Sequence, residues 1–112
     1  MSEASDRGAS IRRRMAEVVA RHGPWTAHSI DLGDGIRTFE NPLNVKLLTT
    51  LHFIRSFARK PLEELRILDL GCLEGGYAIE LGLQKAHAVG IEARTNNIAK
   101  ARFAKEVLGL AN

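Results

Sequence analysis

The stretch Arg66-Ile-Leu-Asp-Leu-Gly-Cys-Leu-Glu-Gly-Gly-Tyr77 decides the fold of this 112-residue chain. In it, a short apolar run ends near the acid Asp69, passes through a glycine-rich turn and opens a helix. A second apolar run ends in another acid, Glu92, which follows Asp69 by 23 residues. Strands that alternate with helices in this way are typical of a parallel strand pair joined by a right-handed crossover.

This order of parts suits a cofactor that contains a nucleoside. Glycines let the backbone approach a ligand, a helix N-terminus presents free N–H groups, and an acid at the next strand tip accepts ribose hydroxyls. The glycines alone are weak evidence, because Leu73 stands where G-x-G-x-x-G has its second glycine. The setting strengthens them, since the turn follows a strand and Glu92 lies at the next strand tip. Asp69 favours a ligand with a cationic ammonium group over a pyrophosphate, which it would repel.

These residues resemble the first two motifs of class I S-adenosylmethionine-dependent methyltransferases. The resemblance rests on Ile67-Leu-Asp-Leu-Gly-Cys-Leu-Glu-Gly-Gly76 and on Val89-Gly-Ile-Glu92. The family pattern is Asp-x-Gly-x-Gly-x-Gly. Asp69, Gly71 and Gly75 match it, and Leu73 replaces the middle glycine, as in a subgroup that reads Asp-Leu-Gly-Cys-Leu-Glu-Gly-Gly.

A second, looser resemblance lies nearer the N-terminus. The stretch His28-Ser-Ile-Asp-Leu-Gly-Asp-Gly35 is similar to the segment before the Rossmann domain in methyltransferases related to those that modify the tRNA wobble uridine. The family motifs cover roughly residues 43–112, and the family's third to seventh strands have no counterpart. We therefore expect the N-terminal, cofactor-binding part of such an enzyme.

The resemblance implies a site for S-adenosyl-L-methionine. Asp69 would receive its ammonium group, Glu92 would hold both ribose hydroxyls, and Ala93 would pack near the adenine. The glycine-rich turn would line the methionine and ribose part of the cofactor with Gly71, Cys72, Leu73, Glu74 and Gly75. The family's catalytic residues lie mostly after its fourth strand, so catalytic residues and the methyl acceptor stay unassigned.

The remaining segments predict an α/β protein with a Rossmann-like β-α-β-α half. For residues 1–9 the sequence predicts a disordered tail. For residues 10–61 it predicts a helix, a β-hairpin around Gly33-Asp34-Gly35 and a long helix. In the long helix, Asn41 is the expected N-cap and Pro42 the expected first residue. The apolar residues from Leu43 to Ala58 form a face that we expect to join the core. Residues 62–112 predict the partial Rossmann unit, with strands 65–70 and 88–92 and helices 75–85 and 95–108.

Two parallel strands make an incomplete sheet, because parallel sheets are normally buried on both faces. We expect the chain to self-associate or to be marginally stable. A rival hypothesis is a non-catalytic interaction module that another chain completes. A further rival is a nicotinamide- or flavin-binding Rossmann half.

Composition narrows the functional classes. The formal charge is +3 and aromatic residues make up 5%, so nucleic acid is permitted but not indicated. The four histidines are scattered and Cys72 is the one cysteine, so a metal site is not expected. A single cysteine also fits a reducing, cytoplasmic location. Residues 1–10 are polar and apolar runs are short, so we expect neither a signal peptide nor a membrane span. We interpret Cys72 and Trp25 as structural, and Glu74 as an acid that favours the helix N-terminus it precedes.

Overall fold

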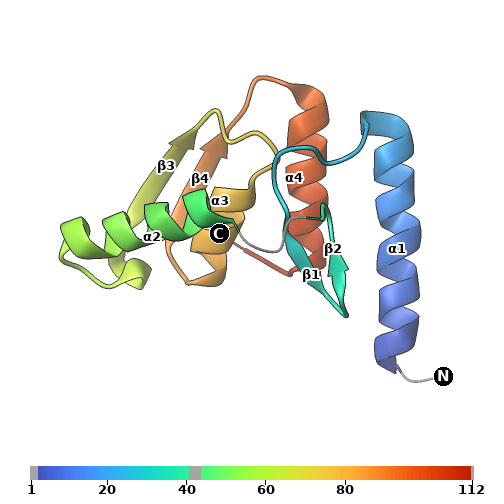
Figure 1. Ribbon diagram of the computed structural model, residues 1–112, viewed down its shortest axis with the longest axis horizontal. Helices are drawn as coiled ribbons and strands as arrows, with labels where there is room; N and C mark the ends of the chain where they lie inside the picture. Colours follow the sequence, from blue (N-terminus) through green and yellow to red (C-terminus); the bar gives the residue numbers. More distant parts are fainter. Residues whose placement is uncertain (1–2, 41–43, 112) are drawn as a thin grey trace.

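The computed structural model describes residues 3–40 and 44–111 and shows a small α/β fold (Figure 1). A helix and a hairpin come first: α1 (Glu3–His22), β1 (Asp31–Gly33) and β2 (Ile36–Arg37). A second helix, α2 (Val45–Ala58), and a short 3-10 helix, η1 (Leu62–Glu64), follow. The chain then alternates as β3 (Arg66–Leu70), α3 (Gly76–Leu83), β4 (His87–Ile91) and α4 (Thr95–Val107).

Strands β3 and β4 form the predicted parallel pair. Their register runs from Arg66 opposite His87 to Leu70 opposite Ile91, and α3 makes the crossover between them. The antiparallel hairpin β1–β2 also forms, but its strands are only three and two residues long. The predicted β-α-β-α order is therefore confirmed for the strand pair and its helices, as is the hairpin.

The first helix is longer than the sequence pattern indicates. It begins at Glu3 rather than Ser10, so the expectation of a disordered tail is wrong for residues 3–9. Arg7 explains part of the difference, because its Nη1 lies 2.8 Å from Oδ2 of Asp34 in the hairpin turn. A polar segment that looks frayed in isolation is thus held by an ion pair with a residue remote in the sequence.

The N-terminus of α2 also differs from the prediction. The helix begins at Val45, and Oδ1 of Asn44 accepts a hydrogen bond from the backbone N–H of Leu47 at 3.0 Å. Asn44 is therefore the N-cap. The predicted cap Asn41 and first residue Pro42 lie outside the described residues.

Two apolar clusters hold the fold together, and α3 contributes to both. One cluster joins α1, the hairpin, α3 and α4; its buried members are Ile11, Trp25, Ile30, Leu32, Ile36, Ile79, Phe103 and Ala104. The other joins α2 to α3 and to the sheet; its buried members are Leu51, Leu62, Leu81 and Ala86. Trp25 is 3% exposed and its ring packs 5.9 Å from that of Phe103, so its predicted place in the core is confirmed. The predicted boundary between residues 61 and 62 does not separate two cores.

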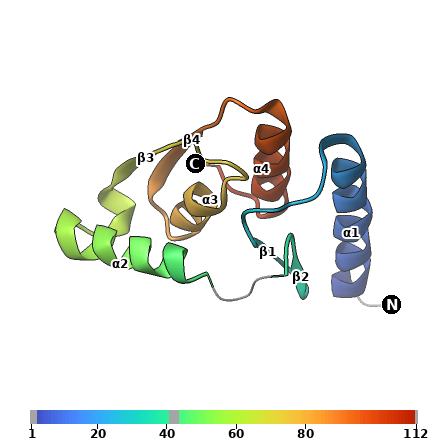
Figure 2. The ribbon, with the colours of Figure 1, turned by 45° about the horizontal axis from the view of Figure 1, so that its top comes forward.

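The arrangement is layered along the long axis of the molecule. Helices α2 and α3 lie on one side of the β3–β4 sheet, and α4 lies between α3 and α1, so that α1 and α2 are at opposite ends (Figures 1 and 2). The apolar face of α2 joins the core through Leu51, with Leu47 and Ile54 partly buried. The loop that leaves the C-terminal end of β3 meets residues 26–28, which precede the hairpin, through Glu74.

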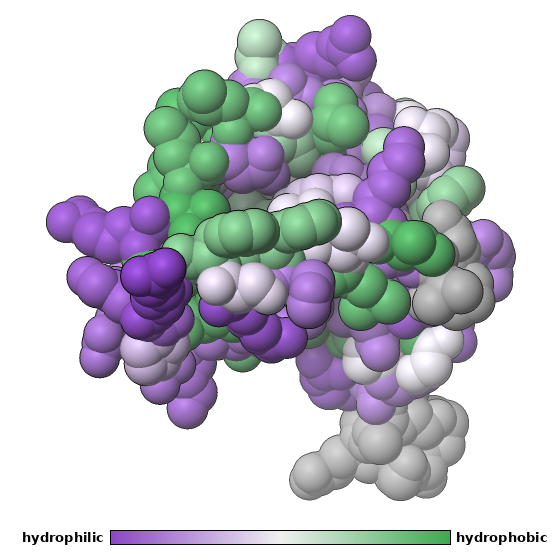
Figure 3. All heavy atoms as spheres, turned by 60° about the vertical axis from the view of Figure 1, so that its left-hand side comes forward, coloured by the Kyte–Doolittle hydropathy of each residue, from purple (hydrophilic) through white to green (hydrophobic). Residues whose placement is uncertain are grey.

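The other face of the sheet is open. Alternate residues of the strands point away from α2 and α3, and Leu68, Leu70, Val89 and Ile91 are 56%, 72%, 59% and 52% exposed. Figure 3 shows apolar side chains gathered over β3 and α2 on the side of the molecule that it brings forward. The expectation of an incompletely covered sheet holds for the described residues.

Within residues 3–40 and 44–111, no helix has both the length and the apolar character that crossing a bilayer requires.

Candidate functional site

Two carboxylates lie at the C-terminal ends of the parallel strands. Asp69 is opposite Gly90 in the β3–β4 register, and Glu92 follows the last residue of β4. The Glu92 carboxylate accepts hydrogen bonds from the backbone N–H of Ala93 at 3.0 Å and from Nδ2 of Asn97 at 2.7 Å. Its partners orient the side chain and leave lone pairs for a further donor.

The Asp69 side chain has a different setting. Within the described part of the chain it accepts no hydrogen bond from backbone or side chain. Partial burial raises the pKa of its carboxyl group, and the nearby His28 acts in the opposite direction. A half-buried carboxylate without an internal partner can receive a cationic donor from a ligand.

The turn between β3 and α3 has the backbone shape that a glycine-rich pattern predicts. Gly71 and Gly75 have φ values of +69° and +84°. Leu73, which replaces the family's middle glycine, also has a positive φ of +52°. The left-handed region is unfavourable for a leucine, so the turn holds this residue in a strained conformation.

The glycines of this region serve different purposes. A Cβ on Gly71 would meet no atom within 4 Å, so open space lies beside this residue. A Cβ on Gly75 would lie 2.8 Å from Cβ of Ala101, and one on Gly90 would lie 2.8 Å from Sγ of Cys72. The close approach at Gly75 is therefore to Ala101 of α4.

Cys72 is packed rather than presented. Its residue is 3% exposed, and its backbone N–H donates to the carbonyl of Ile91 at 2.9 Å. Burial raises the pKa of the Cys72 thiol, with smaller contributions in the same direction from Asp69 and Glu92. A protonated, buried thiol is a poor nucleophile, which agrees with the structural interpretation of this cysteine.

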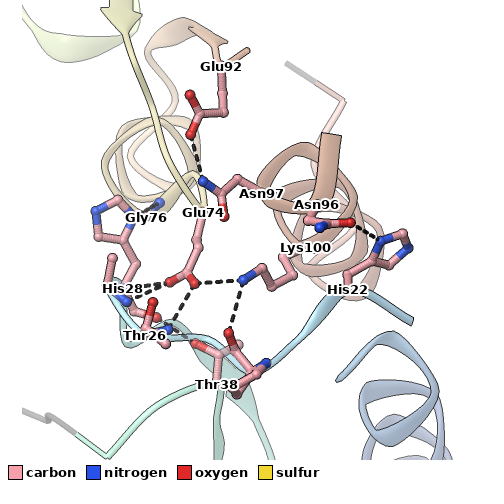
Figure 4. Close-up of polar contacts among 12 residues, drawn as sticks. His22, Thr26, His28, Thr38, Glu74, Gly76, Glu92, Asn96, Asn97 and Lys100 are labelled. Carbon is pink, nitrogen blue, oxygen red and sulfur yellow. Dashed lines mark hydrogen bonds and ion pairs between the residues drawn. The ribbon is translucent and has the colours of Figure 1, made fainter. Parts of the chain in front are cut away.

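Glu74 makes the densest set of polar contacts in the site (Figure 4). Its carboxylate accepts hydrogen bonds from the backbone N–H groups of Thr26 at 2.9 Å, Ala27 at 2.9 Å and His28 at 2.8 Å. Nζ of Lys100 lies 3.1 Å from Oε2 of Glu74 and also donates to the backbone carbonyl of Pro24. Burial by itself would raise the pKa of Glu74, but these hydrogen bonds outweigh it and lower the pKa.

The predicted role of Glu74 at the helix N-terminus is therefore incomplete. The side chain fastens the segment 26–28 to the glycine-rich turn, across 46 to 48 residues of sequence. No local sequence pattern indicates that contact, because a glutamate in a turn can make many different contacts.

His28 belongs to the site, and sequence reasoning missed it. Its Nδ1 accepts a hydrogen bond from the backbone N–H of Gly76 at 2.9 Å (Figure 4). Its ring stacks on that of Tyr77, with the ring centroids 5.4 Å apart. A Cβ on Gly76 would lie 2.8 Å from Cβ and Cγ of His28, so the glycine permits this approach. The signal that could have found His28 is the resemblance of the segment from His28 to Gly35 to methyltransferases.

The protonation state of His28 follows from these contacts. Because Nδ1 accepts a hydrogen bond, the neutral ring carries its proton on Nε2. Burial lowers the pKa of His28, and the opposing effects of Glu74 and Asp69 are smaller. His28 is therefore a neutral hydrogen-bond donor next to the turn.

Comparison with known proteins adds no assignment: no family model, no curated protein and no solved structure matches this chain. Residues 3–40 and 44–111 contain no group of three or more His, Cys, Asp or Glu side chains placed to hold a metal ion.

Proposed function

We propose that the chain is the S-adenosyl-L-methionine-binding part of a methyltransferase. The observation that carries this proposal is the pair of carboxylates Asp69 and Glu92 at the C-terminal edge of the parallel strands. Gly71, two residues after Asp69, has open space beside it. Ligands of open parallel sheets bind at this edge. A half-buried acid that accepts no hydrogen bond from the described residues suits the ammonium group, and an acid with spare lone pairs suits the ribose hydroxyls.

Each part of the cofactor has a residue that could hold it. Asp69 would hold the ammonium group, Glu92 the ribose hydroxyls, and the backbone from Gly71 to Leu73 the intervening part. Ala93 is exposed at the strand tip, where it would lie near the adenine. When bound, the cofactor supplies a methyl group on a positively charged sulfur. The protein's share is to orient the two reactants.

The helix N-terminus favours this cofactor over a dinucleotide. A pyrophosphate needs free backbone N–H groups at the start of the helix after the turn. Here the N–H of Gly75 donates to the carbonyl of Cys72 at 2.8 Å, and that of Gly76 donates to His28. With these donors engaged and Asp69 nearby, the nicotinamide or flavin alternative is the weaker proposal.

Calorimetric titration of the 112-residue chain with S-adenosylhomocysteine tests the proposal. Glu92→Ala should weaken binding at least about tenfold, since it removes charge-assisted hydrogen bonds worth roughly 1.5–3 kcal/mol each. Glu106→Ala is the matched control, because Glu106 is an exposed acid on α4. Equal affinity of the Glu92 variant and the unmodified chain would refute the ribose assignment.

A second variant tests the turn itself. Gly71→Val should abolish binding, because its side chain would fill the open space and its φ of +69° is unfavourable for valine. The far-ultraviolet circular dichroism should stay close to that of the unmodified chain. Full binding by the valine variant would show that the turn faces away from the ligand.

The open apolar sheet face supports a second candidate, a non-catalytic interaction module. Four exposed residues, Leu68, Leu70, Val89 and Ile91, form a continuous surface across both strands. Another chain, or a second copy, would cover this face and pair with a strand edge. Absence of any binding of S-adenosylhomocysteine would favour this candidate.

A further inference from the structure

A cavity of about 460 Å³ lies beside the glycine-rich turn. Three segments remote in the sequence line it: Ala27 and His28 before the hairpin, Asn44 to Lys46 at the start of α2, and Leu73 and Tyr77 from the turn and α3. Its volume is within the range of sites for small molecules. It exists because Glu74 fastens the segment 26–28 to the turn.

Among the described residues, the lining of this cavity has one sign of charge. Lys46 supplies a cation, Asn44 a neutral amide, and none of the described lining residues carries a carboxylate. The remaining polar groups include the phenol of Tyr77 and the ring of His28, whose Nδ1 is engaged by Gly76 and whose Nε2–H is left as the donor. A cation and hydrogen-bond donors together favour a ligand with an anionic group.

The rest of the lining favours a flat, largely apolar ligand. Ala27, Val45 and Leu73 contribute aliphatic surface, and Leu73 is 36% exposed. The stacked rings of His28 and Tyr77 add aromatic surface. Aromatic ligands pack well against such surfaces.

We propose that this cavity binds the methyl acceptor, and that the acceptor is a small aromatic anion whose charge lies at Lys46. The proposal rests on the proposed function, because it places the acceptor next to the cofactor: Leu73 lines the cavity and belongs to the turn at which the cofactor would bind. His28, which connects the cavity to the first turn of α3, would donate a hydrogen bond to the acceptor.

Methyl-resolved NMR of the full chain saturated with S-adenosylhomocysteine tests this inference. The probe is 4-hydroxybenzoate, and 4-hydroxybenzamide is its neutral counterpart. The signals of Ala27, Val45 and Leu73 should shift in a saturable way with the anion, which should bind about tenfold more tightly than the amide. Lys46→Gln should remove this preference. Lys60→Gln is the control, because Lys60 is an exposed cation that follows α2 and does not line the cavity.

Each outcome separates this inference from the proposed function. Binding of S-adenosylhomocysteine without any shift of the three methyl signals by 4-hydroxybenzoate would overturn the inference alone. An unchanged preference for the anion in Lys46→Gln would also overturn it. Shifts by 4-hydroxybenzoate in a chain that does not bind S-adenosylhomocysteine would refute the assignment of the cavity to a methyl acceptor.

Discussion

Nζ of Lys100 and Oε2 of Glu74 lie 3.1 Å apart, and the two side chains are 6% and 2% exposed. The pair joins α4 to the glycine-rich turn. Because Glu74 also accepts three backbone hydrogen bonds from residues 26–28, its carboxylate is the point at which the N-terminal segment, the turn and α4 meet. This one contact therefore supports both the site at the strand ends and the cavity beside it.

We expect Glu74→Ala to lower the free energy of unfolding by about 3–5 kcal/mol, because it leaves a buried ammonium group and three backbone N–H groups without their acceptor. Urea denaturation followed by the fluorescence of the buried Trp25 measures the change. In Glu106→Ala, the loss of an exposed ion pair with Arg14 should cost less than about 1 kcal/mol. Equal effects of the two substitutions would contradict this role of Glu74.

Stability should also fall in acid because of Glu74. Its folded-state pKa is lowered from the reference value of 4.5. The stabilisation is therefore fully present above pH 4.5 and is lost as the pH falls through the lowered folded-state pKa. Melting temperatures measured along a descending pH series should show the unmodified chain losing stability faster than Glu74→Gln below pH 4.5. Parallel curves for the two proteins would count against the assignment.

Leu73→Gly should be nearly neutral for stability. The substitution relieves roughly 1–2 kcal/mol of left-handed strain at φ +52°, against roughly 0.5–1 kcal/mol of added chain entropy in the unfolded state. Leu48→Gly is the comparison, since Leu48 is 56% exposed inside α2 and its replacement should cost about 1 kcal/mol. Urea denaturation of the two variants decides the point, and a larger loss in Leu73→Gly would mean that the leucine side chain stabilises the turn.

The open sheet face should make the chain self-associate or melt at low temperature. Replacing Leu70 and Val89 together with lysine places two charges on this face and should shift the chain toward a monomer. Sedimentation velocity at several concentrations measures the association, and thermal melting measures the stability. A monomer at every concentration with a sharp melt, for the unmodified chain, would show that α1 and the hairpin complete a sufficient core.

Local pattern was enough for the strand–helix alternation from β3 to α4. Apolar runs of strand length, the glycine-rich turn and the apolar face of α2 are properties of neighbouring residues. The positions of Asp69 and Glu92 at the strand ends could be predicted for the same reason, since strand ends follow from the period of the sequence.

The contacts that assemble the site were decided by the tertiary structure alone. Whether residues 3–9 are helical depends in part on Asp34, the role of Glu74 depends on Thr26 to His28 and on Lys100, and the place of His28 depends on the absent side chain of Gly76. Each of these contacts joins groups at least 26 residues apart in the chain. Hydrophobic period and turn chemistry carry no information at that range, because a buried polar group finds its partner only after the apolar faces have packed.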